Sequence, residues 1–108
     1  MQVNILGVPY SIEYADEESD SRMEGNYGFT DSSVKEIGIC RLEPESNSMK
    51  NLKSVEMKVA RHEIIHAFLE ESGLGEECSF ARNEELIDWI AIQLPKILEA
   101  CQQAKALY

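Results

Sequence analysis

Residues 55–69 read VEMKVARHEIIHAFL, and this stretch decides how the chain folds. One stripe of apolar and histidine side chains recurs in it at alternating spacings of four and three residues: Val55, Val59, His62, His66 and Leu69. That spacing places them on one face of an α-helix. The central turns are apolar on other sides too, which is typical of a buried helix. We therefore predict a core helix over residues 49–73, with Gly73 closing it.

The sequence before this helix is strand-like. Tyr10, Ile12 and Tyr14 alternate with polar residues, as in a half-buried strand. Shorter runs of the same kind lie at 3–6, 25–30 and 34–42, and turn-forming residues separate them. We expect residues 1–45 to form a small antiparallel sheet, a meander of three or four strands.

A second long helix is predicted over residues 81–107. Its apolar stripe runs through Leu86, Ile90, Leu94 and Ile97, and Pro95 should kink it or split it. With the strands and the first helix, this gives a single α+β domain over residues 1–108, in which a small sheet packs against two main helices.

Composition excludes several classes of function. The chain has 108 residues, of which 44% are hydrophobic, and a formal net charge of −10. Such an acidic protein repels phosphate groups, so nucleic acid and anionic membranes are poor partners. Its three cysteines are odd in number and widely spaced, which indicates free thiols and not a disulfide framework. Because no signal peptide or membrane-spanning run is visible, we expect a soluble, cytoplasmic protein.

The sequence His62-Glu63-Ile64-Ile65-His66 is an HExxH motif within the first helix. Two histidines four residues apart on a helix can both reach one metal ion, and Zn²⁺ is the usual one. Glu63 lies about 100° round the helix from His62, beside the metal, where it can take a proton from water. The alternative is two ordinary histidines on a core helix. That arrangement would place three neighbouring polar side chains on an apolar helix, which costs free energy unless something satisfies their hydrogen bonds.

A zinc site of this kind needs a third protein ligand, and both histidines of the chain are already in the motif. Glu84 is our first choice, since it shares a helix face with Asp88, which can accept the second ring proton of a ligand histidine. Glu85 is the second choice of ligand, and the thiolate of Cys78 is the third choice. Both glutamates can instead simply favour the start of a helix through its dipole.

His62-Glu63-x-x-His66 followed by Asn83-Glu84-x-x-x-Asp88 resembles the gluzincin metallopeptidases. The short strands before the helix and the run Ile87-Asp88-Trp89-Ile90-Ala91 more closely resemble short phage and mobile-element proteins related to the ImmA/IrrE-type metallopeptidases. The resemblance implies that Glu84 is the third zinc ligand and that Asp88 supports a ligand histidine. It also implies that the substrate is a regulatory protein, such as a phage repressor.

The strand before the motif helix is our candidate for binding the substrate, through Ile37, Gly38, Ile39 and Cys40. In zincins the sheet edge beside the metal usually receives an extended peptide, because an unpaired edge offers main-chain hydrogen bonds. The alternative is that this strand is interior or a plain edge.

The leading hypothesis is therefore a zinc metalloendopeptidase that acts on a peptide or protein, with Glu63 as general base. The rival hypotheses are a non-catalytic zinc-binding module for protein interaction on the same fold, and a structural domain without metal.

Overall fold

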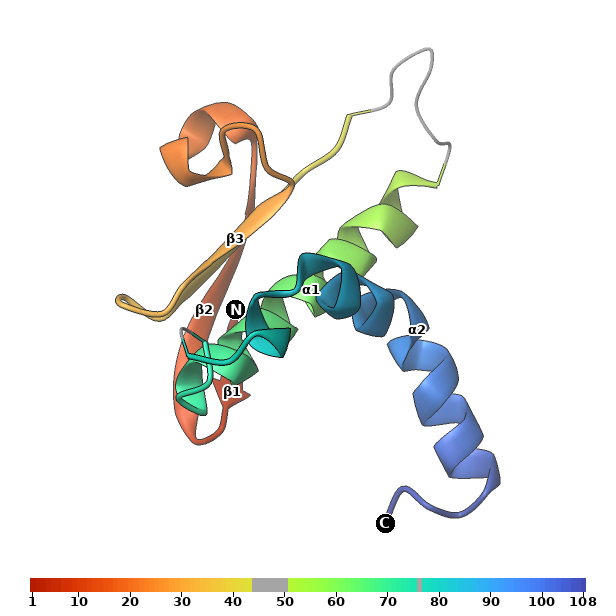
Figure 1. The fold of residues 1–108 in the computed structure, drawn as a ribbon. Coiled ribbons are helices and arrows are strands. Elements are labelled where there is room, and N and C mark those ends of the chain that lie inside the picture. The colour runs from red at the N-terminus through yellow and green to blue at the C-terminus, as the bar shows by residue number, and fades with distance from the viewer. Residues whose placement is uncertain (44–50, 76) are drawn as a thin grey trace.

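In the described residues, 1–43, 51–75 and 77–108 of this computed structural model, four strands form one sheet and two long helices follow it (Figure 1). The strands are β1 (Gln2–Ile5), β2 (Val8–Ala15), β3 (Gly28–Asp31) and β4 (Glu36–Cys40), and the helices are α1 (Leu52–Glu71) and α2 (Glu84–Gln103). The predicted α+β class, a small sheet packed against two main helices, is confirmed.

The sheet is mixed, which corrects the predicted antiparallel meander. Its order is β1-β2-β4-β3, and β4 runs parallel to β2, whereas the outer pairs β1–β2 and β3–β4 are antiparallel. Between β2 and β3 the chain passes through two short 3₁₀ turns, Glu17–Ser19 and Ser21–Met23, before it returns as a hairpin. Alternating apolar residues reveal the two faces of a strand but not its direction or its neighbours, so the sequence pattern missed this.

One face of the sheet packs against α1. Strand residues such as Tyr10, Ile12, Ile37 and Ile39 form the buried core there, together with Val59 and Ala67 of the helix.

The edge strand β3 approaches α1 closely because it carries a glycine. A Cβ atom on Gly28 would lie 3.0 Å from Cγ1 of Val59 and 3.1 Å from Cγ of Glu63. It would also lie 2.9 Å from the Gly38 carbonyl oxygen of β4, so a larger residue would force the strand or its neighbours to shift. Gly28 brings the sheet edge directly against the motif residues.

Local hydrogen bonds set the ends of α1. The side chain of Asn51 accepts a bond from the Ser54 amide at the first turn. At the other end Gly73 has φ +84°, and the Leu74 amide donates to the Leu69 carbonyl, as in a Schellman motif. The predicted closure by Gly73 is confirmed. The predicted first residues, 49 and 50, lie outside the described residues.

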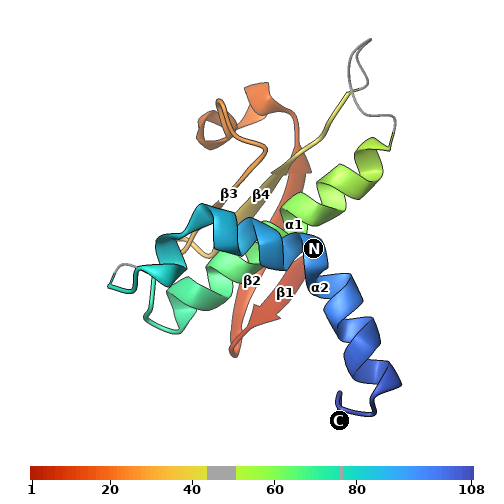
Figure 2. The same ribbon diagram turned by 45° about the vertical axis from the view of Figure 1, so that its right-hand side comes forward.

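Helix α2 starts later than predicted, after a 3₁₀ turn at Phe80–Arg82. Asn83 is its N-cap and accepts from the Leu86 amide at 3.1 Å. The first half of α2 lies against α1, on the side away from the sheet, and the second half extends away from the molecule (Figure 2). Pro95 lies inside the helix, whose axis bends visibly in Figure 2. None of the described helices has the length and apolar character that crossing a membrane requires.

Candidate metal centre

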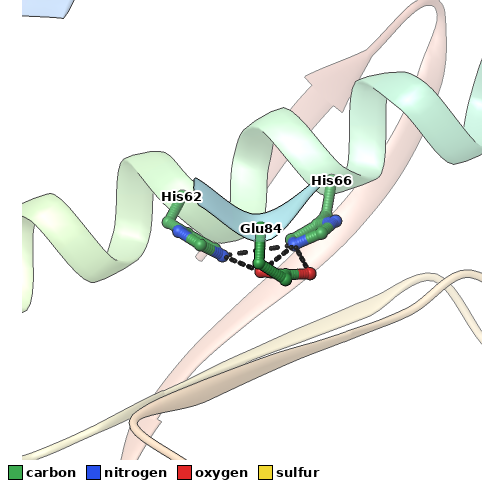
Figure 3. Close-up of side chains that lie close together, drawn as sticks. All are labelled: His62, His66 and Glu84. Carbon is green, nitrogen blue, oxygen red and sulfur yellow. Dashed lines mark hydrogen bonds and ion pairs between the residues drawn. The ribbon is translucent and has the colours of Figure 1, made fainter. Parts of the chain in front are cut away.

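Three predicted ligand side chains meet between the two helices (Figure 3). Nε2 of His62 lies 3.2 Å from Nε2 of His66 and 2.9 Å from Oε2 of Glu84. Nε2 of His66 lies 3.0 Å from Oε1 of Glu84. Ligands bound to one tetrahedral ion at about 2.0–2.1 Å are about 3.3 Å apart. His62, His66 and Glu84 therefore have the spacing of ligands that share an ion, and they can hold a metal.

Asp88 lies one turn beyond Glu84 and contacts the other side of the His62 ring. Its Oδ1 lies 3.0 Å from Nδ1 of His62 and accepts a hydrogen bond from Nζ of Lys58 at 2.8 Å. The Lys58 ammonium, and secondarily His62, holds the pKa of the Asp88 carboxyl below its usual value. An ionised Asp88 keeps the proton of the neutral His62 imidazole on Nδ1. The Nε2 atom of the ring then carries a free lone pair.

The donor chemistry of the centre calls for a cation. With its ring proton on Nδ1, His62 presents an acceptor at Nε2, and the carboxylate of Glu84 presents only acceptors. Acceptor atoms 2.9 Å apart need a positive charge between them, either a proton or a metal ion. The residues present thus fit a divalent ion held by two nitrogens and one carboxylate oxygen.

The start of α2 selects between the candidate third ligands. Because Asn83 caps the helix, Glu84 becomes its first residue and points toward α1 (Figure 3). In the part of the chain that the structure describes, the group of converging ligand atoms includes Glu84 and neither Glu85 nor Cys78. The two alternatives that the sequence left open are not brought to the site.

Glu63, the predicted general base, is buried, with 8% of its surface exposed. The Thr30 hydroxyl of β3 lies 2.9 Å from Oε1 of Glu63 and also 2.9 Å from its backbone carbonyl oxygen. Burial raises the pKa of the Glu63 carboxyl, while the Thr30 hydrogen bond acts in the opposite direction. A carboxyl with a raised pKa is suited to exchanging protons near neutral pH.

A cleft of about 520 Å³ opens over these residues. Its walls come from α1, from the start of α2 and from the sheet edge at Asn26, Tyr27, Gly28 and Thr30. The ligand group and Glu63 both line it, so a molecule in the cleft reaches the candidate metal and the carboxylate together.

The predicted substrate strand does not form an open edge. Ile37, Gly38, Ile39 and Cys40 belong to β4, which pairs with β2 on one side and with β3 on the other. All four residues are buried. The strand order, which the sequence pattern does not reveal, places β3 at the edge beside the cleft instead.

Two residues of the site were missed from the sequence. Lys58 precedes His62 by four residues, so its place on the motif face could have been read from the spacing. Thr30 is far from Glu63 in sequence, and no local pattern marks it as a partner.

Comparisons with protein-family models, with curated proteins and with solved structures found no match for this chain. The class of the protein thus rests on its own geometry. It is an α+β protein with two histidines and a glutamate that can hold a metal ion, beside a buried glutamate in a cleft.

Proposed function

We propose that the protein is a zinc-dependent metalloendopeptidase. The observation that carries the proposal is the position of Glu63, which is buried and lines the same cleft as His62, His66 and Glu84. A metal site with a structural role alone gains nothing from an adjacent buried carboxyl group, which costs stability. A hydrolytic site needs such a base next to the metal.

The donor set supports zinc as the metal. Two imidazole nitrogens and one carboxylate are the ligands of many hydrolytic zinc sites, in which three protein ligands leave a position open. A zinc ion held there supplies a Lewis acid that acidifies water and polarises a carbonyl group. Asp88 orients the His62 ring, and Lys58 keeps Asp88 ionised.

Glu63 is the proposed proton carrier. It accepts a proton from water as the water oxygen attacks the peptide carbonyl carbon, and it donates that proton to the amine nitrogen as the C–N bond breaks. The Thr30 hydroxyl fixes one carboxylate oxygen and leaves the other to act. Burial by β3 and α1 keeps the carboxylate in one orientation.

The edge strand β3 is the proposed binding site for the main chain of the substrate. Within the described residues its outer side has no strand neighbour, and it borders the cleft. An extended peptide can add to such an edge through backbone hydrogen bonds. The resemblance to ImmA/IrrE-type peptidases makes a regulatory protein of a phage or mobile element the first substrate to offer.

The proposal is tested with metal content and the Glu63→Gln variant. Elemental mass spectrometry of the purified chain should find about one zinc per chain, and the variant should retain it. Peptide hydrolysis by the variant should fall by about 10²–10⁴-fold, because the amide cannot accept the proton. Equal hydrolysis by both proteins would contradict the role of Glu63. Zinc binding without hydrolysis of any peptide or protein would favour the non-catalytic zinc module.

A further inference from the structure

Four carboxylates line the cleft, and one of them has no assigned task. Glu63 accepts from Thr30, Glu84 contacts both histidines, and Asp88 contacts Lys58 and His62. Within residues 1–43, 51–75 and 77–108, the Glu70 carboxylate makes no hydrogen bond or ion pair.

The Glu70 side chain occupies a space that the absence of a side chain at Gly75 leaves open. Glu70 follows His66 by one helical turn, on the same face of α1. Its carboxylate lies against the backbone of Gly75, where an added Cβ atom would be only 2.3 Å from Oε1. Any larger residue at position 75 would therefore displace the carboxylate. The position of the Glu70 charge depends on Gly75 as well as on the helix.

With a divalent ion bound in the cleft, one negative charge stays uncompensated, and this charge belongs to Glu70. A divalent ion is offset by the carboxylates of Glu84 and Glu63, and Lys58 is offset by Asp88. The protein as a whole is also acidic, with a formal net charge of −10, so no distant positive field cancels this charge.

We propose that Glu70 is a specificity-determining residue that binds a lysine or arginine side chain of the peptide substrate. This inference rests on the proposed peptidase function and adds a substrate class to it. One helical turn separates Glu70 from His66 by about 6 Å along the axis. An extended peptide covers that distance in about two residues. The basic side chain therefore lies about two residues from the scissile bond, always on the same side of it.

The experiment offers the zinc-loaded full chain a mixed library of synthetic peptides and reads the cleavage sites by mass spectrometry. Lysine and arginine should be enriched at one fixed position near the cleaved bond. Glu70→Gln should lower kcat/KM for peptides that carry the basic residue by about tenfold, the effect of losing one charge-assisted hydrogen bond. The readout is the ratio of kcat/KM between these peptides and matched peptides with a neutral residue there, and this ratio should fall by the same factor.

Two further variants separate the subsite from general effects. Gly75→Ala should weaken the basic preference without a change of charge, because the added methyl group displaces the carboxylate. Glu99→Gln removes the same charge from an exposed position on α2 and should leave the preference intact.

Cleavage without a basic preference, or with a preference that survives in Glu70→Gln, would overturn this inference and leave the peptidase proposal standing. A zinc-loaded chain that cleaves no peptide would overturn both. Circular dichroism and zinc content establish that each variant is folded and loaded.

Discussion

Helix α1 packs against the sheet on one side and against α2 on the other, whereas α2 packs against α1 on one side. Val59, Glu63 and Ala67 of α1 are buried toward the sheet, and the opposite side of the helix contacts α2. All twenty residues of α2 are described, and the buried ones are Ile87 and Ala91. Its second half extends into solvent in both views (Figures 1 and 2). The two histidines thus lie on a helix that is packed on both sides. Glu84 and Asp88 lie on α2, whose packing contact with the rest of the protein is smaller.

The largest expected effect of breaking this arrangement is the loss of a histidine ligand from α1. His66→Ala should weaken zinc binding by more than about a hundredfold, since even residues that only orient ligands are worth 10–100-fold. Glu84→Ala should also weaken binding strongly, and Glu85→Ala should not, because Glu85 lies outside the ligand group. Competition with a chromophoric chelator measures all three affinities. Equal losses in the two glutamate variants would mean that the third ligand is assigned wrongly.

Asp88→Asn tests the contribution that α2 makes without touching the metal. The amide is a weaker acceptor for the Nδ1 proton of His62 and no longer pairs with Lys58 as a charge. We expect zinc affinity to fall by about 10–100-fold. The same chelator competition measures it, with Glu99→Gln as the control for loss of one charge on α2. An affinity within twofold of the control would rule out an orienting role.

The sequence predicted the elements that carry the site better than it predicted their arrangement. A spacing of four residues on a helix fixes the relation of His62 to His66, and likewise that of Glu84 to Asp88, because helix geometry is local. Gly73 closes helix α1 two residues beyond Glu71, as expected, for the equally local reason that glycine tolerates a positive φ.

The arrangement of the strands could not be predicted in the same way. Strand pairing joins residues that are distant in sequence, and the alternation in β4 is compatible with an edge or an interior position. This is why the substrate edge was assigned to residues 37–40 and not to β3. The partnership of Thr30 with Glu63 depends on the same pairing and on the close approach at Gly28.

The unequal burial of α2 predicts unequal costs of mutation along it. Ile87→Ala removes a side chain that is 1% exposed and should lower the free energy of unfolding of the metal-free protein by about 2–5 kcal/mol. Ile97→Ala removes one that is 39% exposed and should change it by no more than about 0.5 kcal/mol. Urea titrations measure both. Similar costs at the two positions would show that the second half of α2 is covered in solution.

The smallest expected effect concerns the tie between the end of α1 and the sheet. Glu71 accepts a hydrogen bond from the buried Tyr10 hydroxyl at 2.7 Å and forms an ion pair with Lys35. The hydrogen bond from Lys35, and to a lesser extent the one from Tyr10, holds the pKa of the Glu71 carboxyl below its usual value. Its ionised form is therefore more favourable in the folded state than in the unfolded chain.

A carboxyl with a lowered pKa stabilises the fold above its unfolded pKa, about 4.3 for glutamate, and this stabilisation is lost as the pH falls through the folded value. Glu71→Gln should lower the Tm at pH 7, and the difference from the parent protein should shrink steadily below about pH 4. Thermal melts of the metal-free proteins over pH 3–7, with Glu99→Gln as control, measure this. A difference that stays constant with pH would mean that the Glu71 charge does not hold α1 to the sheet. In that case packing alone would secure this end of the helix.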